Sequence, residues 1–446
     1  MIPKAKYQRM ERRSFLTSAA TGFALTTLPD WFSARAEAAE AEAQAARPRR
    51  VAANDKIRIG LIGAGGSKGG FRQGLGDARN IASRPGVECV AVCDVDLKHL
   101  QEASEVFEGS KKYVDFRYLL DRTDIDAVVI GTPDHWHAVI AGMAMRKGKD
   151  VYCEKPMTLT IGEGQQLVKL AKDNGTVWQT GSQQRSDARF RLACELVRNG
   201  RIGQVKKVIA HLPGGSRGSN FQVTEAPDDF LFDMWLGPAP ETPYIKERTH
   251  GSFRHWFDYS GGMMTDWGAH HLDISQWGLG MDKSGPVKIK STGTAQPADA
   301  EKRSFEAFLE YEVTYTYANG VELLATDKGE NGVTFEGEDG RWIFVSRGRI
   351  AASDPKLLTD PLPKSAERLY VSDNHAQNFV DGIRTRKQPI CNVEVGHRSA
   401  SVCHLGNLSL RLGGRELNWD PKKETFKDDA EANGMINRKM RGGWTV

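Results

Sequence analysis

The sequence has few cysteines, and none of them is spaced as metal ligands usually are. Six cysteines occur in 446 residues, with no Cys-x-x-Cys pair and no His-Glu-x-x-His pattern. The pattern therefore gives no support to a zinc site. Cys89 and Cys93 lie four apart on one predicted strand, too far from each other to form a disulfide. We expect no bound metal, and small buried apolar roles for Cys89, Cys93, Cys153, Cys194, Cys391 and Cys403.

Beyond residue 50 the chain has no excess of charge of either sign, and it has no long apolar run. Residues 1–50 hold nine Lys/Arg and five Asp/Glu out of totals of 61 and 57, so the remainder is formally neutral. No basic face is implied, which argues against a nucleic-acid partner. No run of about 18 apolar residues occurs, so the mature protein is not expected to span a membrane. The length suits two or three domains of a soluble globular protein.

The N-terminal segment has the features of a targeting signal. Arg12-Arg13-Ser14-Phe15-Leu16 is a twin-arginine pattern, residues 18–28 are weakly hydrophobic, and Ala34-Arg35-Ala36 offers small residues for cleavage. A disordered basic tail is the alternative. The order of the three features favours a twin-arginine signal peptide over residues 1–36, followed by a linker over 37–54. This predicts a periplasmic or otherwise extracytoplasmic protein.

A glycine-rich turn follows the first predicted strand. The strand, residues 56–63, is apolar and runs into Gly63-Ala64-Gly65-Gly66. Glycines at this position permit a tight turn and let a pyrophosphate approach backbone amides at a helix N-terminus. Lys68 occupies the place of the third glycine of the fingerprint, although Gly69 serves if the turn is one residue longer. A plain glycine-rich loop is the alternative to a dinucleotide site at Gly63, Gly65 and Gly66.

The second predicted strand, residues 87–94, is apolar and ends in Asp94. An acid at this strand end bonds the adenosine ribose hydroxyls in the Rossmann plan. Asp94 follows Gly65 by 29 residues rather than the usual ~20, and a loop over 72–85 is expected to account for the excess. Because a carboxylate repels a 2′-phosphate, NAD is favoured over NADP. A solvated aspartate in a turn is the alternative.

Two further strands complete the expected nucleotide domain, residues 55–181. Residues 126–133 end in Thr132-Pro133, with His137 just beyond, and Val151 to Cys153 run into Glu154-Lys155-Pro156. Strands alternating with helices predict a parallel sheet, and ligands bind at the carboxyl ends of such strands. Because a residue before proline is excluded from the α region, Lys155 is presented on a turn at that edge. A solvated loop lysine is the alternative.

From Gly203 the pattern changes to short alternating runs with turns such as Asn319-Gly320, which predict antiparallel strands over residues 204–211, 287–291, 305–317, 321–327 and 341–345. We assign residues 182–420 to this second domain and 421–446 to a tail.

Asp266 and His270 are four residues apart, so a helix places both on one face. A carboxylate beside an imidazole raises its basicity, which suits proton transfer. A satisfied core histidine is the alternative, and zinc at His250, His255, His270 and His271 is a weaker one.

These motifs, in this order, resemble the Gfo/Idh/MocA oxidoreductases, a family named for glucose–fructose oxidoreductase and inositol dehydrogenase. The run from Gly396 to Asn407 resembles an exported branch of the family. The resemblance implies an α/β protein with an N-terminal Rossmann domain and a C-terminal α/β domain built on a large, open, mainly antiparallel sheet. It also implies a homo-oligomer through that sheet. The implied NAD-binding residues are Gly63, Gly65, Gly66, Asp94, Thr132, Pro133, His137, Glu154, Lys155 and Pro156.

The resemblance further implies a catalytic triad of Lys155, Asp266 and His270. Hydride leaves a carbinol carbon for the nicotinamide while His270, oriented by Asp266, takes the hydroxyl proton and Lys155 stabilises the reacting oxygen. Core packing is the alternative for each candidate substrate contact. Those candidates are Gln183, Arg185, Trp267 and His271, with Gln184, Trp235 and Trp256 as further ones.

We therefore expect an exported NAD(H)-dependent oxidoreductase acting on a hydroxyl of a sugar, polyol or glycoside, with a tightly bound cofactor recycled in place. One alternative is a redox-neutral, NAD-dependent glycosidase that works by transient oxidation and elimination. The other is a non-catalytic protein that only holds a dinucleotide.

Overall fold

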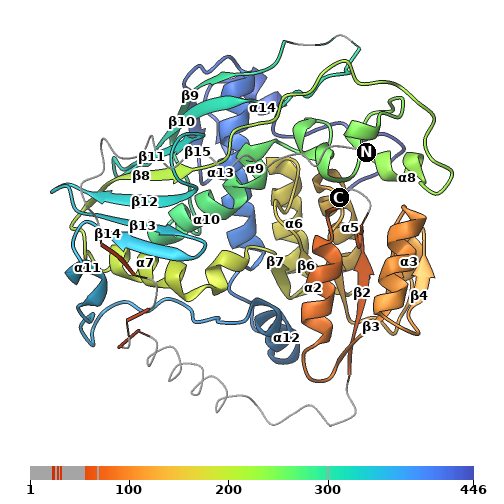
Figure 1. Cartoon of the computed structure of the whole chain (residues 1–446), viewed down its shortest axis with the longest axis horizontal. Coiled ribbons are helices and arrows are strands. Elements are labelled where there is room, and N and C mark those ends of the chain that lie inside the picture. The colour runs from red at the N-terminus through yellow and green to blue at the C-terminus, as the bar shows by residue number, and fades with distance from the viewer. Residues whose placement is uncertain are drawn as a thin grey trace, which may run out of the picture.

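The computed structural model describes residues 23–25, 28–29, 31–32, 56–67, 70–297, 299 and 301–446. Within them, one parallel sheet and one larger mixed sheet stand side by side, with helices between and around them (Figure 1). This arrangement confirms the predicted α/β class. None of the helices in these ranges is long and apolar enough to cross a membrane.

The first sheet has six strands in the order β4-β3-β2-β5-β6-β7, and every neighbouring pair is parallel. Its central strands are almost wholly buried because helices cover both faces, as parallel sheets require. The strands are β2 (Ile57–Ile62), β3 (Val87–Cys93), β4 (Lys111–Tyr113), β5 (Ala127–Ile130), β6 (Asp150–Cys153) and β7 (Trp178–Thr180). The connecting helices are α2 (Gln73–Ala82), α3 (Leu97–Val106), α4 (Phe116–Leu120), α5 (Asp134–Arg146) and α6 (Ile161–Asn174).

The segment expected to be a loop over 72–85 is instead occupied by helix α2, so that prediction was wrong. Gly74 in this helix packs so closely on the first strand that a Cβ there would lie 2.1 Å from the carbonyl oxygen of Gly63. Gly74 therefore provides the close helix–strand packing that the third glycine of the fingerprint usually provides. Gly69 lies outside the described residues.

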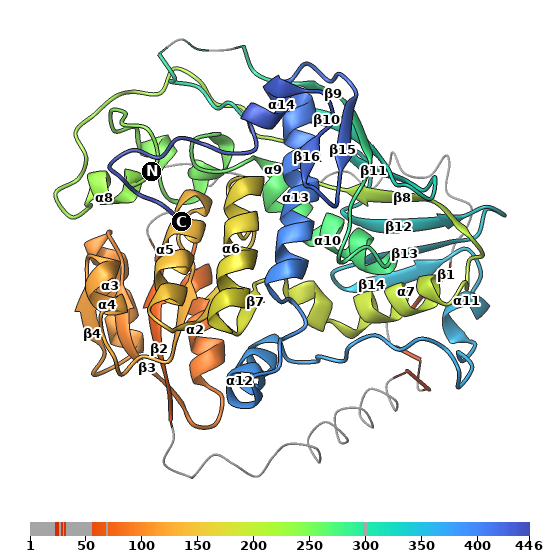
Figure 2. The same cartoon turned by 180° about the vertical axis from the view of Figure 1, so that it is seen from behind.

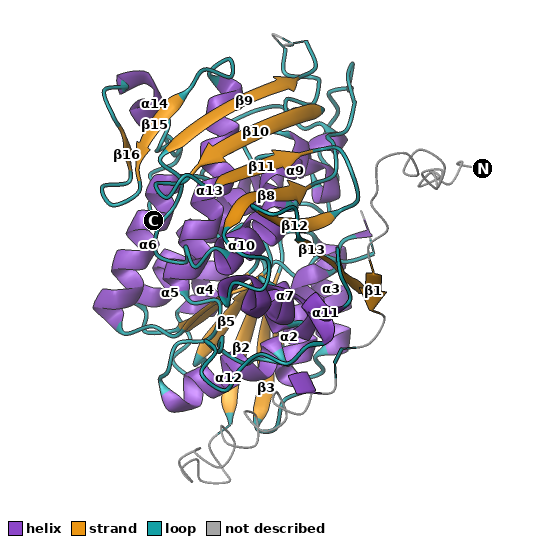
Figure 3. Ribbon diagram, turned by 90° about the vertical axis from the view of Figure 1, so that its left-hand side faces the viewer, coloured by secondary structure: helices purple, strands orange, loops and turns teal. Residues whose placement is uncertain are grey.

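The second sheet has ten strands in the order β1-β14-β13-β12-β8-β11-β10-β9-β15-β16. Its pairs are antiparallel except for β8 with β11, which are parallel. Figure 3 looks onto its open face. Along strands such as β8 and β10, buried side chains alternate with partly exposed ones. The large, mainly antiparallel sheet expected from the sequence is thus confirmed. Its strands are β1 (Phe23–Leu25), β8 (Val205–His211), β9 (Lys288–Thr294), β10 (Glu310–Thr316), β11 (Glu322–Thr326), β12 (Gly332–Gly337), β13 (Trp342–Ser346), β14 (Arg349–Ala352), β15 (Leu417–Asp420) and β16 (Thr425–Phe426).

The inner face of this sheet is covered by α7 (Ala188–Arg198), α10 (Gly268–Gly278) and α13 (Val393–Arg411). After the sheet, the chain returns to the first domain, where α12 (His375–Thr385) contacts α2 and α13 contacts α6. The final residues follow α14 (Ala430–Gly434) and bring the C-terminus beside α5 (Figure 2). There the ring of Trp444 meets that of Trp136 edge-on at 4.9 Å, so the tail wraps its own chain.

Part of the predicted signal peptide belongs to the folded body. Strand β1 pairs antiparallel with β14 at the end of the large sheet. Phe32 is buried, with the guanidinium carbon of Arg191 4.6 Å from its ring centre. The twin arginines Arg12 and Arg13 and the linker over 37–54 lie outside the described residues.

Candidate active site

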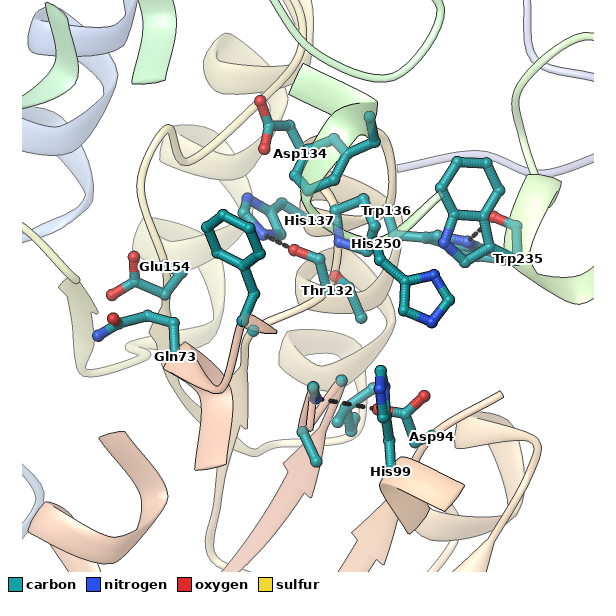
Figure 4. Close-up of a pocket in the computed structure, with 18 of the residues that line it drawn as sticks. Gln73, Asp94, His99, Thr132, Asp134, Trp136, His137, Glu154, Trp235 and His250 are labelled. Carbon is teal, nitrogen blue, oxygen red and sulfur yellow. Dashed lines mark hydrogen bonds and ion pairs between the residues drawn. The ribbon is translucent and has the colours of Figure 1, made fainter. Parts of the chain in front are cut away.

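A pocket lies between the two domains, along the carboxyl ends of the parallel strands. One end is lined by Asp94, Val114 and Phe116 of the first domain, and the other by Lys155, His270 and Arg347. Figure 4 shows part of its wall, with Asp94 and His99 at one side of the view and Asp134 at the other. This edge is where the strand order of a Rossmann domain places ligands.

The glycine turn forms one wall of the pocket. Gly63 and Gly65 have φ of +78° and +63°, a left-handed conformation that glycine adopts without strain. Both line the pocket, and the backbone N–H of Gly65 donates to Asp94 Oδ2 at 3.1 Å. Gly66, also predicted to bind the cofactor, packs instead under His99, whose ring would lie 2.4 Å from an added Cβ. The turn thus leaves space for a close backbone approach, as a bound pyrophosphate requires.

Asp94 stands at the carboxyl end of β3, where the sequence placed it, and lines the pocket. Burial raises the pKa of its carboxyl group. The nearby His99 and hydrogen bonds from the backbone N–H groups of Asp96 and Gly65 lower this pKa and so partly offset the effect of burial. The carboxylate therefore organises the turn as well as facing the pocket.

His137 connects the second predicted motif to the third. Its ring nitrogens lie 2.7 Å from the carbonyl oxygens of Thr132 and Pro156, and burial lowers the pKa of the imidazole. The Lys155–Pro156 peptide bond is cis. His137 therefore ties the end of β5 to the turn that presents Lys155. Of the predicted cofactor residues on these motifs, Thr132, Pro133, His137, Glu154 and Lys155 line the pocket, and Pro156 does not.

Two of the three predicted catalytic side chains are in direct contact. Lys155 Nζ lies 2.5 Å from Asp266 Oδ1, and Arg254 Nε lies 3.1 Å from the same oxygen. Burial raises the pKa of Asp266, but Lys155 and Arg254 outweigh it and hold the pKa well below its usual range. Asp266 is therefore a permanent carboxylate that fixes the position of both cations.

His270 lines the same pocket but takes a different orientation from the one expected. The predicted helix is broken at Trp267, between α9 (Met263–Asp266) and α10, so Asp266 ends one segment and His270 lies in the first turn of the next. No hydrogen bond joins the two side chains within the described residues, and His270 Nδ1 is buried without a partner. Burial, followed by the charge of Lys155, lowers the pKa of His270 well below 6.5. The imidazole is therefore neutral, as a base must be.

A buried carboxyl pair supports the end of the strand that carries Lys155. Gln183 Nε2 donates to Glu154 Oε1 at 3.1 Å and to the Tyr152 hydroxyl at 3.2 Å. Burial, together with the charge of Glu154, raises the pKa of Asp77 well above its ordinary value. Gln183 lines the pocket, as predicted, and its amide is held by this network.

Two predicted substrate contacts have structural roles instead. Arg185 is buried and pairs with Asp273 and Asp282 at 2.8 and 2.7 Å. His271 is buried and its Nε2 is hydrogen-bonded to Asn331 Oδ1. Neither lines the pocket. Gln183, on the same short helix as Arg185, and His270, beside His271 on α10, line it instead. Of the remaining candidates, Trp235 and Trp267 line the pocket, whereas Trp256 and Gln184 do not.

Sequence reasoning did not identify the segment that forms a roof over the Asp94 end of the pocket. Residues 230–254 cross from the second domain, and His250 Nε2 lies 3.0 Å from Asp96 Oδ2. His250 has φ of +53°, a strained conformation for a non-glycine residue. Arg254 lies 4.5 Å from the ring centre of Phe71, across the opening. His250 was considered only as a zinc ligand, and the pocket residues missed by sequence reasoning include Asp134, Phe230, Phe253, Arg254 and Arg347.

The histidines considered as zinc ligands, His250, His255, His270 and His271, do not form a cluster of potential metal ligands among the described residues. Within the ranges that the structure describes, one set of three side chains, Asp96, His99 and His250, brings potential ligand atoms within 4.8 Å of one another. In that set, Asp96 already contacts His250, and its other oxygen accepts from backbone N–H groups at the start of α3. The cluster therefore serves as a contact between the roof and the first domain.

Two family models match the chain over most of its length. An oxidoreductase-family NAD-binding Rossmann fold matches residues 57–182, and an oxidoreductase-family C-terminal alpha/beta domain matches residues 215–446. The chain belongs to the Gfo/Idh/MocA oxidoreductase family. It is an enzyme of the NAD(P)-dependent oxidoreductase class, with a Rossmann domain for the dinucleotide.

Individual relatives agree with this assignment. The chain is 29% identical to myo-inositol 2-dehydrogenase of Thermotoga maritima over 372 residues, or 80% of this chain and 94% of that protein. It is 31% identical to a glycosyl hydrolase family 109 protein of Shewanella pealeana over 178 residues, or 37% of each chain. The fold matches the WlbA dehydrogenase from Bordetella pertussis, solved with NADH and UDP-GlcNAcA, with a TM-score of 0.60 at 20% identity. That match covers 82% of this chain and 99% of the other.

Proposed function

We propose that this protein is an exported NAD(H)-dependent oxidoreductase acting on a hydroxyl group of a sugar, polyol or glycoside. The observation that carries the proposal is the convergence of Lys155, Asp266 and His270 at one end of a pocket whose other end is a dinucleotide site. The inositol dehydrogenase and glycosyl hydrolase relatives act on polyols or glycosides, which supports this substrate class. We further propose that the protein is periplasmic and assembles through the open face of the ten-stranded sheet.

The chemistry follows from the side chains at the Lys155 end. When bound, the dinucleotide supplies a hydride acceptor for the carbinol carbon. Lys155, fixed by Asp266, donates a hydrogen bond to the reacting oxygen and stabilises its developing negative charge. His270 is neutral and lines the pocket, so it takes the hydroxyl proton. Asp266 acts by holding Lys155 rather than by orienting His270.

Two features of the pocket bear on the cofactor. Asp94 lines the pocket at the end of β3, where it would hold the adenosine ribose hydroxyls of NAD and its charge would repel a 2′-phosphate, which favours NAD over NADP. The roof of residues 230–254, closed by the contact between His250 and Asp96, covers the adenosine end. A covered cofactor leaves slowly, so we propose that NAD is retained and regenerated within the same active site.

The retention and the reaction are tested together on the purified protein. Denaturing it should release about one equivalent of NAD into the supernatant. Adding sugars, polyols and glycosides to the native protein should reduce the bound cofactor without added NAD, and mass spectrometry should identify the product. A protein that emerges empty and turns over only with millimolar NAD would be an ordinary dehydrogenase.

A redox-neutral glycosidase is the second candidate, favoured by the likeness to the family 109 glycosyl hydrolase. Such an enzyme oxidises a hydroxyl, eliminates the aglycone and returns the hydride. Release of aglycone without accumulation of NADH would identify it. The convergence of Lys155, Asp266 and His270 argues against the third alternative, a protein that only holds a dinucleotide.

A further inference from the structure

A further buried carboxyl group lines the pocket and has no part in the mechanism above. Asp134, the first residue of α5, is buried beside the Lys155 end of the cavity (Figure 4). The hydroxyl of Ser260 donates to Asp134 Oδ2 at 2.5 Å. Ser260 is the one hydrogen-bond partner that the carboxyl group has among the described residues, and Asp134 lines the pocket. One oxygen is therefore fixed, and the other is not engaged by a partner from the described part of the chain.

The charges around Asp134 differ from those around Asp266. Burial, with a smaller contribution from the neighbouring carboxylate of Asp266, raises the pKa of Asp134 to about 7. Ser260, Arg254 and Lys155 act in the opposite direction, as does the N-terminal end of helix α5. Near neutral pH the group is thus available both as an acid and as a carboxylate. Asp266, held between two cations, is available only as a carboxylate.

We propose that Asp134 is a second catalytic acid–base residue of this pocket, which exchanges a proton with the leaving oxygen of a glycoside separately from His270. The inference rests on the proposed function and directs it towards the redox-neutral cleavage. A simple oxidation needs only one proton acceptor, for the hydroxyl proton that leaves with the hydride. A cleavage needs another group, because a second oxygen must gain a proton.

The proton and electron balance shows where Asp134 acts. After the oxidation, His270 has passed the hydroxyl proton to water. The carbon beside the new ketone then loses its proton to His270, its electron pair forms a C=C bond, and the neighbouring bond to the aglycone oxygen breaks. That oxygen keeps the bonding pair and takes a proton from Asp134. Water then adds its oxygen to the carbon that held the aglycone and returns a proton to Asp134. His270 reprotonates the neighbouring carbon, the hydride returns, and the carbonyl oxygen gains a proton from water.

Asp134→Asn keeps the shape and the acceptor for Ser260 but removes the acidic proton. In this variant, glycosides should still reduce the bound cofactor in a single turnover at a rate within about threefold of the wild type. Release of a poor leaving group such as methanol should fall by at least ~100-fold, the scale of a lost general acid. Release of 4-nitrophenolate, which leaves without a proton, should change little. An unchanged rate of methanol release, or a wild type that oxidises glycosides without cleaving them, would overturn the proposal.

Failure of the proposed function gives a different result, because then no sugar or glycoside reduces the wild-type cofactor. In that case infrared titration still tests Asp134. The wild type should show a protonated carboxyl band that disappears near neutral pH and is missing from Asp134→Asn. Its absence from the wild type would overturn the inference. Asp121→Asn, at an exposed carboxylate outside the pocket, is the matched control and should retain the band.

A variant of Ser260 separates a catalytic role from a structural one. Because its hydrogen bond lowers the pKa of Asp134, Ser260→Ala should move the carboxyl titration to higher pH. Methanol release requires the protonated form, so its decline at alkaline pH should shift upward by the same amount. A purely structural Asp134 would leave the pH profile of release in place.

Discussion

The ammonium group of Lys155, at the end of a strand in the first domain, lies 2.5 Å from Oδ1 of Asp266 in the second domain. Arg254 contacts the same oxygen from the roof segment. The carboxylate of Asp266 therefore joins a lysine more than a hundred residues away to an arginine from the segment just before α9. The position of Lys155 depends on how the domains dock, and not only on the turn that carries it.

Replacing Lys155 with alanine should lower turnover by at least ~100-fold, because the reacting oxygen loses its positioned cation. The NAD content of the purified protein should stay as in the wild type, since the lysine lies at the far end of the pocket from Asp94. Steady-state rates and released NAD measure the two effects. Lys172→Ala, on the exposed side of α6, is the control. Near-wild-type turnover of Lys155→Ala would remove this residue from the mechanism.

Replacing Asp94 with alanine should weaken NAD binding by about tenfold or more, the scale of lost hydrogen bonds to a charged group. It should also narrow the preference for NAD over NADP, because the repulsion of a 2′-phosphate is removed. Calorimetry on cofactor-depleted protein measures both affinities. Asp94→Asn retains an acceptor for the N–H of Gly65, so it separates the effect of losing the charge from the effect of disturbing the glycine turn. Unchanged NAD affinity in both variants would place the ribose elsewhere.

Opening the roof should speed release of the cofactor. In His250→Ala the contact with Asp96 is lost, and we expect NAD to dissociate roughly tenfold faster, the equivalent of about 1.4 kcal/mol. Dissociation is followed by loss of NADH fluorescence during exchange against unlabelled NAD. His211→Ala, on the large sheet and outside the pocket, is the control. Equal rates in the wild type and His250→Ala would show that the roof does not retain the cofactor.

Stability should fall as the pH drops below about 6.5. Burial lowers the pKa of His135 to about 3 and those of His255, His375 and His404 to about 4. Because the unfolded chain binds more protons than the folded one between these values and pH 6.5, acid favours unfolding in that window. Denaturant titrations from pH 7.5 to 4.5 measure the slope. His404→Gln should flatten it by removing one such group, and a flat wild-type profile would contradict the prediction.

Deleting the last six residues should lower the melting temperature and the retained NAD. Trp444 packs on Trp136, which lines the pocket, and the carbonyl of Val446 accepts from Arg146. Differential scanning calorimetry and NAD release measure the two losses. Trp444→Phe preserves an aromatic contact and should recover most of both. If the truncated protein has the melting temperature and the NAD content of the wild type, the tail does not stabilise the part of the pocket formed by Trp136.

The sequence by itself determined the parts that depend on local chemistry. Apolar strands that end in Gly63, Asp94, Thr132 and Lys155 specify a parallel sheet with these residues at one edge, because carboxyl ends of parallel strands align. The spacing of alternating runs specified most of the second sheet as well. Short strands such as β12 and β14 were missed, since runs of four to six residues between glycine turns carry little periodic signal.

Only the tertiary structure decided which polar side chains face the pocket. Arg185 and His271 have the residue types of substrate contacts, yet a buried position with Asp273 or Asn331 as partner gives each a structural role. A break at Trp267 turned Asp266 towards Lys155 and away from His270. The roof residue His250 and the buried acid Asp134 acquire their positions from contacts with Asp96 and Ser260, each more than a hundred residues away. Such contacts arise from the docking of two domains, and no local pattern encodes them.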